Sequence, residues 1–353
     1  MKYARPTVAD IPAYDEIIDV RSPSEFAEDH IPGAINCPVL DDAQRAEVGT
    51  LYKQVSPFEA KKLGAALVSE NIARHLKERF LNKPKQWKPL IYCWRGGDRS
   101  GSMTTILRAI GWSAGQLDGG YKAWRGHTVE RLIARPAEMQ FVVIGGPTGS
   151  AKTRLLQALA RQGEQVLDLE TLASHKGSVL GTLPGQPQPP QKWFETCVLQ
   201  QLEAFDPARP VYVEAESRKI GRIHLPEGLI ERIRLGECIQ IDASLDARVT
   251  FLQDDYDYFI QDPARLQRRL EALRNLHSRE VMNQWETLIQ AGDWPGIVRD
   301  LLEKHYDPLY RRSQDRNFAR QADATVFATD DLSTVGIERL AAAIIQSRRA
   351  QMA

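Results

Sequence analysis

Two loops of the kind that binds phosphate-sized anions lie in this one chain. The first is headed by a cysteine, Cys93–Ser100 (CWRGGDRS), and the second is rich in glycine, Gly146–Thr153 (GPTGSAKT). Each follows a short apolar run and precedes a segment with helical spacing of apolar residues. A strand-to-helix junction of this type points backbone N–H groups at an anion. The chain is therefore predicted to be an α/β protein, and an enzyme that uses both loops must handle two activated groups.

The length of 353 residues exceeds one ordinary hydrophobic core, so two or three domains are expected. We predict a first domain over residues 1–135 and a second over 136–353. Apolar runs at 16–20 and 89–92 predict strands in the first. Runs at 141–144, 165–168, 211–214, 238–241 and 324–327 alternate with helical segments and predict a parallel sheet in the second. The arginine-rich stretch from about 262 to 320 predicts a helical insertion in that sheet domain.

Charge and cysteine content exclude several classes of protein. Acidic and basic residues balance at 46 each, so any nucleic-acid site must come from local clustering. The four cysteines show no CxxC pair and no histidine at metal-ligand spacing, which argues against a disulfide framework and a zinc site. No apolar stretch approaches the length of a membrane span, and no apolar signal core follows the first residues. We expect a cytoplasmic protein with reduced thiols and no membrane partner.

The cysteine loop has the composition of a reactive thiol site. A thiolate is the nucleophilic form of cysteine, and a helix N-terminus with nearby guanidinium groups stabilises it. Gly96 and Gly97 would let the loop turn N–H groups inward around a transferred group. We predict Cys93, Arg95 and Arg99 as the catalytic residues. The alternative is a buried structural cysteine, which has no need of flanking arginines and glycines.

The glycine loop has the spacing of a phosphate-binding loop, with Lys152 as a point charge and Thr153 as a magnesium ligand. Ala151 replaces the glycine expected before the lysine; its methyl group is tolerated if the residue is already helical, and otherwise narrows the cradle. A glycine-rich turn without a ligand is the weaker alternative. The predicted phosphate-binding residues are Gly146, Thr148, Gly149, Ser150, Lys152 and Thr153.

Two carboxylates, Glu214 and Glu216, end a predicted strand of the second domain. Ligands of open α/β sheets gather at the carboxyl ends of strands, so these side chains would position magnesium or a base. Pairing with Arg218 and Lys219 is an equal alternative.

Four motifs of the first domain resemble the rhodanese family. They are Asp19–Arg21 (DVR), His30–Ala34 (HIPGA), the cysteine loop and Leu117–Tyr121 (LDGGY). Rhodaneses carry sulfur as a cysteine persulfide. Five residues separate Cys93 from Arg99, one more than in the usual sulfurtransferase loop, and this spacing also resembles a cysteine phosphatase. A rhodanese-fold phosphatase is therefore an alternative. Asp19 and Arg21 are expected to form a structural ion pair.

Nearly the whole chain resembles the tRNA 2-selenouridine synthase family, in which a rhodanese-like domain precedes a P-loop NTPase-like parallel-sheet domain. Besides the two loops, the matching segments are 168–170 (DLE), 175–178 (HKGS), 186–189 (QPQP), 214–221 (EAESRKIG) and 305–308 (HYDP). The resemblance implies replacement of sulfur by selenium at the wobble 2-thiouridine of tRNA, with selenophosphate as donor. It also makes His175 a further candidate site residue.

The same resemblance implies that geranyl diphosphate first alkylates the sulfur, giving S-geranyl-2-thiouridine. Alkylation has a chemical reason, because a thiocarbonyl sulfur leaves poorly whereas an alkylated one departs as a thiol. Our hypothesis is that the phosphate loop holds the prenyl diphosphate while Cys93 carries selenium. No resident cofactor is implied: selenophosphate and geranyl diphosphate are co-substrates, Mg²⁺ is a candidate ion, and a selenophosphate-producing enzyme is a candidate partner.

A tRNA partner requires a basic surface, for which the helical insertion supplies arginines. The candidates are Arg265, Arg268, Arg269, Arg274, Arg279, Arg311, Arg312, Arg316 and Arg320. A solvated helix face is the alternative, since Glu271 and Glu280 are interleaved. Trp285, Tyr306 and Tyr310 would either stack on an unstacked base or fill the helical core. A phosphate-sensing protein with a degenerate glycine loop is a further alternative, but it leaves the cysteine loop unexplained.

Overall fold

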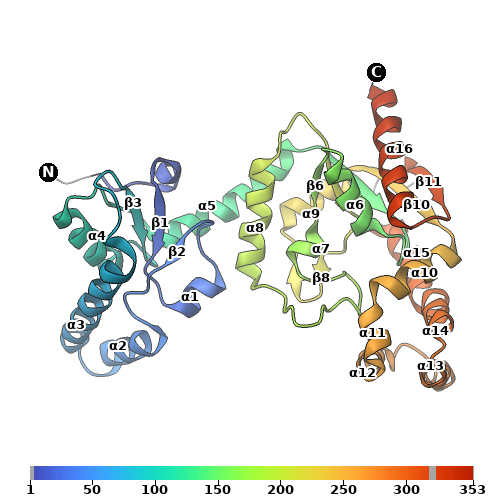
Figure 1. The fold of residues 1–353 in the computed structure, drawn as a ribbon, viewed down its shortest axis with the longest axis horizontal. Coiled ribbons are helices and arrows are strands. Elements are labelled where there is room, and N and C mark those ends of the chain that lie inside the picture. The colour runs from blue at the N-terminus through green and yellow to red at the C-terminus, as the bar shows by residue number, and fades with distance from the viewer. Residues whose placement is uncertain (1–3, 318–322, 353) are drawn as a thin grey trace. The chain divides into compact units, whose positions relative to one another are not determined.

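The computed structural model describes residues 4–317 and 323–352, which form two compact α/β units (Figure 1). The first unit holds the chain up to Arg131 together with residues 195–200. The second holds residues 132–194 and the chain from 201 onward. Helix α5 (Gly120–Ala134) contains the point at which the chain passes from the first unit to the second.

The sheet of the first unit has four parallel strands in the order β2-β1-β3-β4. They are β1 (Glu16–Asp19), β2 (Ile35–Asn36), β3 (Pro89–Tyr92) and β4 (Gly115–Gln116). Ile18 of the central strand β1 lies opposite Ile35 on one side and Ile91 on the other. The two strands predicted at 16–20 and 89–92 are therefore confirmed.

Helices cover both faces of this sheet. They are the 3₁₀ helix η1 (Val8–Ala13), α1 (Pro23–Glu28), α2 (Asp42–Gln54), α3 (Pro57–His75), the π-helical turn η2 (Leu76–Phe80), α4 (Asp98–Ile110) and α5. One apolar core joins Ile18 and Ile91 to Ile72 of α3 and Leu107 of α4. A second core on the opposite face joins Leu90 and Tyr92 to residues at the start of α5.

The second unit is built on the predicted parallel sheet, whose five described strands have the order β11-β10-β5-β7-β6. They are β5 (Phe141–Gly145), β6 (Gln165–Leu167), β7 (Val211–Glu214), β10 (Glu237–Ala243) and β11 (Thr325–Thr329). A short antiparallel pair, β8 (Lys219–Ile220) and β9 (Ile223–His224), stands apart from the sheet. Strands β5 and β7 are buried along their whole length, which explains their continuous apolar sequence.

Helical segments connect or flank these strands, and the middle of one of them, residues 195–200, belongs to the first unit. They are η3 (Arg135–Glu138), α6 (Lys152–Arg161), α7 (Leu169–Leu172), α8 (Gln191–Ala204), α9 (Glu227–Arg234), α10 (Leu245–Asp255) and α16 (Thr334–Met352). Apolar residues of α6 and α16 share one core with β5 and β10.

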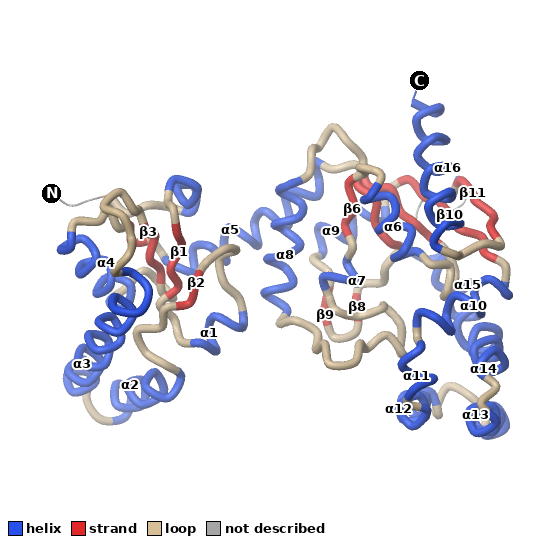
Figure 2. Tube along the Cα trace, in the orientation of Figure 1, coloured by secondary structure: helices blue, strands red, loops and turns tan. Residues whose placement is uncertain are grey.

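The predicted insertion between β10 and β11 is helical, but the helical region begins earlier than residue 262 (Figure 2). After α10 it continues as α11 (Asp257–Gln261), α12 (Pro263–Leu270), η4 (Glu271–Leu273), α13 (Arg279–Ala291), α14 (Trp294–Leu301), η5 (Leu302–Tyr306) and α15 (Asp307–Asn317). Asp262 marks a cap between two helices, since its carboxylate accepts a hydrogen bond from the Arg265 N–H. Positions 318–320 of the predicted insertion lie outside the described residues.

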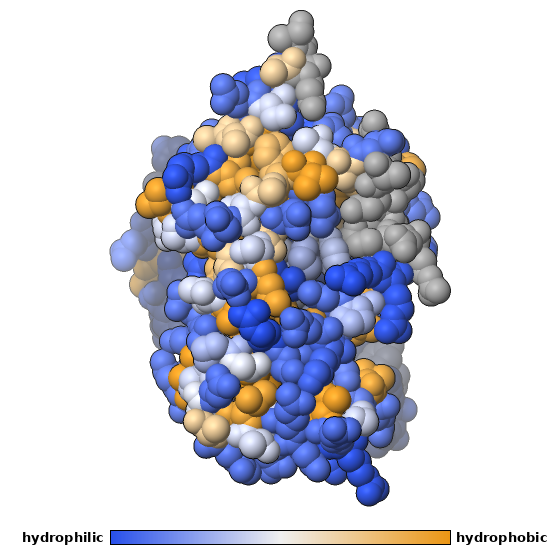
Figure 3. All heavy atoms as spheres, turned by 90° about the vertical axis from the view of Figure 1, so that its right-hand side faces the viewer, coloured by the Kyte–Doolittle hydropathy of each residue, from blue (hydrophilic) through white to orange (hydrophobic). Residues whose placement is uncertain are grey.

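Apolar groups on the face drawn in Figure 3 form separate patches among hydrophilic ones. Within residues 4–317 and 323–352, no helix combines the length and the apolar character that a membrane crossing requires.

Candidate active sites

The first candidate site lies where β3 meets α4. Cys93 follows the last residue of β3, and Gly97 is the N-cap of α4. The Cys93 side chain is only 3% exposed, and the Ser100 hydroxyl donates a hydrogen bond to its sulfur at 3.2 Å. Gln116 of β4 supports this hydroxyl with an amide hydrogen bond of 3.0 Å. The thiol is thus held at a strand-to-helix junction, as the sequence predicts.

The start of α5 forms backbone hydrogen bonds with the cysteine loop. The N–H groups of Tyr121 and Lys122 donate to the carbonyls of Cys93 and Trp94, at 2.8 and 3.0 Å. Gly120 has a φ of +57°, and a Cβ there would collide with the Cys93 carbonyl oxygen. This glycine, part of the rhodanese-like LDGGY motif, therefore permits the close approach of two backbone segments.

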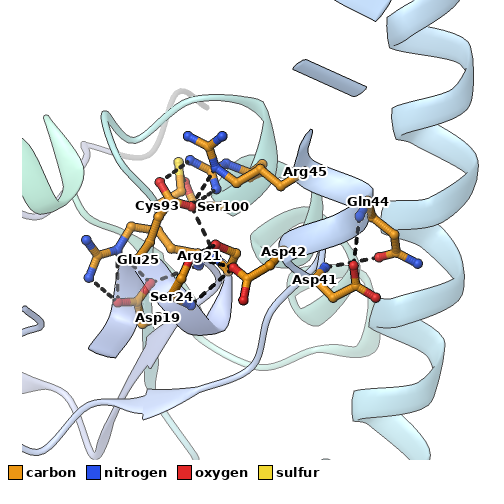
Figure 4. A network of polar contacts seen from close by, with 12 residues as sticks. Asp19, Arg21, Ser24, Glu25, Asp41, Asp42, Gln44, Arg45, Cys93 and Ser100 are labelled. Carbon is orange, nitrogen blue, oxygen red and sulfur yellow. Dashed lines mark hydrogen bonds and ion pairs between the residues drawn. The ribbon is translucent and has the colours of Figure 1, made fainter. Parts of the chain in front are cut away.

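The two predicted catalytic arginines occupy different environments. Arg99 pairs with Glu25 of α1 at 2.7 Å. Arg45 binds the same carboxylate at 2.8 Å, and Figure 4 shows Arg45 and Glu25 side by side. Burial alone would raise the pKa of Glu25, but the hydrogen bond and charge of Arg99, aided by Arg45, lower it to about 2. The charge of Arg99 is thus balanced by a carboxylate in this structure. Arg95 is exposed and forms no hydrogen bond or ion pair with any described residue.

Asp19 and Arg21 form the predicted structural ion pair. Their side chains are 0% and 1% exposed, and the closest guanidinium-to-carboxylate distance is 2.6 Å. Arg21 also donates to the Asp29 carbonyl and lies 4.0 Å from the centre of the Tyr121 ring. The pair therefore ties β1 to the start of α5, which in turn supports the cysteine loop.

The three remaining cysteines lie outside the cysteine loop. All four are free, and Cys37 and Cys238 are buried while Cys197 is half-buried. Burial raises the pKa of both Cys37 and Cys197 to about 11, so these thiols stay protonated near neutral pH.

The second candidate site is the glycine loop between β5 and α6. Lys152 donates from Nζ to the Gly146 carbonyl at 3.0 Å, and Thr153 donates to Glu170 at 3.0 Å. Ser150 is 1% exposed and its hydroxyl donates to the Pro147 carbonyl at 2.8 Å, so this residue stabilises the loop from within. The other five predicted phosphate-binding residues line one pocket of about 790 Å³. That volume suits a small-molecule ligand.

Ala151 adopts a left-handed backbone conformation, with a φ of 55° and a ψ of 29°. It is the N-cap of α6 and does not belong to the helix, so the tolerance that the sequence suggested for a helical residue does not apply. The position keeps a conformation that favours glycine, at a cost of about 1–2 kcal/mol for a residue with a Cβ. Ala151 also belongs to the apolar core under the sheet, which offsets part of this cost.

Three carboxylates meet beside the glycine loop. Oxygen atoms of Glu170, Glu214 and Glu216 all lie within 4.8 Å of one another. Sequence reasoning did not single out Glu170, although its DLE segment follows a predicted strand. Strands β6 and β7 pair in parallel, with Leu167 opposite Val213, so residues after their carboxyl ends come together. Among the described residues, neither Glu214 nor Glu216 pairs with Arg218 or Lys219, and Arg218 instead faces Glu227.

The carboxylate cluster fits a hard divalent cation. Glu214 is 3% exposed, and its Oε1 atom has no hydrogen-bond partner among the described residues. Burial raises the pKa of all three carboxyls. The negative charge of Glu214 raises the pKa of Glu170 and of Glu216 further, and the pKa of Glu216 reaches about 8. Mg²⁺ prefers such oxygen ligands and would relieve the repulsion. The structure thus adds Glu170 to Glu214 and Glu216, the two carboxylates that the sequence offered for positioning magnesium or a base.

His175 and Lys176 line the same pocket. His175 is 6% exposed, and burial, with the charge of Arg269, lowers its pKa, so its ring is neutral near pH 7. Lys176 contacts Asp255 at 2.6 Å and lies 4.2 Å from the centre of the Tyr256 ring. The pocket therefore contains both a neutral imidazole and a second lysine.

One buried arginine connects the glycine loop to the helical insertion. Arg248 of α10 donates from Nε to the Thr148 carbonyl at 2.8 Å and pairs with Asp307 of α15 at 2.6 Å. Asp307 belongs to the HYDP segment, for which sequence reasoning gave no role. The ion pair fixes the loop backbone against the insertion.

The candidate RNA-binding arginines whose side chains are described are exposed or half-buried. Arg268, Arg274 and Arg279 line a pocket of about 890 Å³ on the insertion, whose walls contain both polar and apolar residues. Arg274 pairs with the interleaved Glu271 at 2.6 Å, as the solvated-face alternative expects. The side chains of Arg316 and Arg320 lie outside the described residues.

The aromatic candidates are tied into the insertion or the sheet. Trp285 is 0% exposed and donates to Asp300 at 2.8 Å, so it fills the helical core and is not available to stack on a base. Tyr306 packs against that core, and Tyr310 contacts Gln240 of β10 at 3.1 Å.

Two family models match the chain, one to each unit. A rhodanese-like domain matches residues 7–127, and a tRNA 2-selenouridine synthase AAA domain matches residues 139–272. A protein of Alcanivorax borkumensis called tRNA 2-selenouridine synthase is 33% identical, and the match covers 88% of this chain and 91% of the relative. The chain belongs to the tRNA 2-selenouridine synthase family.

Other members of this family match over similar lengths. The relative from Bdellovibrio bacteriovorus is 37% identical, with 85% of this chain and 89% of the relative covered. That from Nitrosomonas europaea is 36% identical, with 78% and 72% covered. A solved rhodanese-related protein from Thermoplasma volcanium is 20% identical over 35% of this chain and 93% of its own, with a TM-score of 0.23. The family contains tRNA-modifying enzymes, and both sites described above lie within the matched regions.

Proposed function

We propose that this protein replaces sulfur by selenium at the wobble 2-thiouridine of tRNA in two steps, one at each loop. The relatives carry the name tRNA 2-selenouridine synthase and match both units. The division of labour rests on one observation: one unit contains an anion loop beside a carboxylate cluster, and the other contains the thiol of the cysteine loop.

The first step is alkylation of the sulfur by geranyl diphosphate at the glycine loop. The thiocarbonyl sulfur attacks the first carbon of the geranyl group, the carbon–oxygen bond to diphosphate breaks, and the base loses its N3 proton to solvent. Loop N–H groups and Lys152 would hold the departing diphosphate. Mg²⁺ bound by Glu170, Glu214 and Glu216 would neutralise its charge.

The second step is delivery of selenium from selenophosphate at the cysteine loop. Selenium forms a bond to C2 of the base, the bond from C2 to sulfur breaks, and geranyl thiol leaves with a proton. Water takes up the phosphoryl group as phosphate. Cys93 is the residue assigned to the handling of selenium, with the Ser100 hydroxyl holding its sulfur. A tRNA and an enzyme that makes selenophosphate are the partners this proposal requires.

Mass spectrometry of nucleosides from tRNA incubated with selenophosphate and geranyl diphosphate tests both assignments. Lys152→Ala is expected to abolish geranylation. Cys93→Ala is expected to geranylate normally and to accumulate S-geranyl-2-thiouridine without selenium. Loss of both products in the cysteine variant would overturn the division between the loops. Release of phosphate from an aryl phosphate, without turnover of selenophosphate, would favour the phosphatase alternative.

A further inference from the structure

A second, apolar pocket adjoins the glycine loop inside the helical insertion. It has a volume of about 70 Å³, and helices α10, α11, α12 and α14 contribute to its walls. Its main apolar residues are Leu252, Phe259, Ile260, Trp294, Ile297 and Val298. We propose that this apolar pocket binds the distal segment of the hydrocarbon chain of a prenyl diphosphate whose diphosphate group lies on the glycine loop. This inference rests on the proposed function and names the site of its first co-substrate.

The apolar pocket adjoins the larger pocket of about 790 Å³ at the glycine loop. Five residues line both: Thr148, Ser178, Leu252, Tyr256 and Tyr306. Leu252 also packs against the loop, because a Cβ on Gly149 would lie 2.8 Å from its Cδ1 atom. Gly149 has a φ of +85°, so both backbone conformation and space require glycine here. A single ligand can therefore place an anion on the loop and an apolar tail against Leu252.

The residues that line the apolar pocket favour a prenyl diphosphate over a nucleoside diphosphate. Among the described residues that line the apolar pocket, none is charged, and most are aliphatic or aromatic. A nucleotide would bring a ribose and a base whose polar groups need partners when they leave water. A prenyl chain needs none, and its burial is favourable in proportion to the apolar area covered. The lining thus favours a prenyl diphosphate over a nucleoside diphosphate at this loop.

The walls remain partly open to solvent. Leu252, Ile260, Trp294 and Val298 are half-buried, whereas Phe259 and Ile297 belong to the closed core of the insertion. Apolar side chains left partly exposed around a recess gain from a ligand that covers them. Since the pocket has room for only a short chain segment, it would also select for chain length.

Equilibrium binding of the full-length chain in the presence of Mg²⁺ tests this assignment. Isothermal titration would compare geranyl diphosphate with inorganic diphosphate. The wild type is expected to prefer geranyl diphosphate by about tenfold or more, since even one methylene in an apolar pocket is worth about that factor. Val298→Phe, which fills the apolar pocket, is expected to remove this preference and to leave the affinity for inorganic diphosphate within about twofold.

Val281→Phe provides a matched control. Val281 is also half-buried and packs against the insertion core, but it does not line the apolar pocket. This variant should keep the wild-type preference. The opposite change, Val298→Ala, should enlarge the pocket and shift relative affinity from geranyl towards farnesyl diphosphate.

The outcomes separate this inference from the proposed function. An unchanged preference in Val298→Phe would overturn the apolar-pocket assignment, even with Lys152-dependent diphosphate binding intact. Inorganic diphosphate binding that does not depend on Lys152 would overturn the role of the loop itself. If Val298→Phe also lost inorganic diphosphate, Val298→Ala would decide: a shift towards farnesyl diphosphate supports the pocket, and an unchanged ratio overturns it.

Discussion

Ser100 donates a hydrogen bond from its hydroxyl to the sulfur of Cys93, with 3.2 Å between the two atoms. Both side chains are buried, and Ser100 lies in the first turn of α4, seven residues after the thiol. A hydroxyl donor stabilises a thiolate more than a thiol, because hydrogen bonds to charged groups are stronger. The contact therefore links the reactive form of Cys93 to a neighbouring residue that carries no charge.

Ser100→Ala is expected to slow the alkylation of Cys93 by iodoacetamide at pH 7 by about threefold to tenfold. The variant loses the hydrogen bond that stabilises the charged, reactive form of the sulfur. Mass spectrometry of the modified Cys93 peptide measures the rate. Ser102→Ala is the control, since that hydroxyl donates to the Asp98 carbonyl and does not contact the thiol. Equal rates in the two variants would contradict the role of Ser100.

The ion pair of Glu25 with Arg99 predicts a dependence of stability on pH. The pKa of Glu25 is about 2 in the folded chain, against an ordinary value of 4.5. Because the folded pKa is the lower one, the stabilisation is complete above pH 4.5 and is lost as pH falls towards 2. Glu25→Gln is expected to lower the free energy of unfolding by on the order of 2 kcal/mol at pH 7.

Urea unfolding of the wild type and Glu25→Gln at pH 7 and pH 3.5 checks this expectation. The difference between the two proteins should shrink at the lower pH, where the unfolded carboxyl is mostly protonated. A control is Glu59→Gln, whose carboxylate is half exposed and pairs with Lys62 on the surface. If the difference in free energy of unfolding between the wild type and Glu25→Gln were the same at pH 7 and pH 3.5, the lowered pKa of Glu25 would be excluded.

The left-handed conformation of Ala151 allows a test of whether its methyl group weakens diphosphate binding at the glycine loop. Ala151→Gly would relieve the backbone cost but would lose a buried methyl group and gain chain entropy when unfolded. We expect the free energy of unfolding to change by less than about 1 kcal/mol, because these effects oppose one another. The affinity for inorganic diphosphate should stay within about twofold by isothermal titration. A tenfold gain in affinity would show instead that the methyl group narrows the cradle.

Local sequence patterns were sufficient to predict the two strand-loop-helix junctions. Short apolar runs, glycines and the helical spacing after each loop are properties of neighbouring residues, and the structure has both junctions at the predicted places.

Contacts that depend on tertiary structure were not predictable in the same way. Arg99 pairs with a carboxylate 74 positions earlier, which no spacing rule reveals. Glu170 joins Glu214 only because β6 and β7 are neighbours in the sheet, an order that the alternation of strands and helices does not determine. The conformation of Ala151 also required the backbone itself, since alanine is a poor indicator of a left-handed residue.

The carboxylate cluster predicts that diphosphate binding depends on Mg²⁺ through Glu214. Its Oε1 atom is buried without a hydrogen-bond partner among the described residues, so a cation would supply the missing interaction. Glu214→Gln is expected to raise the Mg²⁺ concentration required for half-maximal diphosphate binding by about tenfold, because it removes one anionic ligand. Titration of Mg²⁺ at fixed inorganic diphosphate measures this. Glu227→Gln, at an exposed carboxylate that faces Arg218 away from the cluster, should leave the requirement unchanged. Wild-type Mg²⁺ dependence in Glu214→Gln, with the fold intact by circular dichroism, would remove this carboxylate from the ion site.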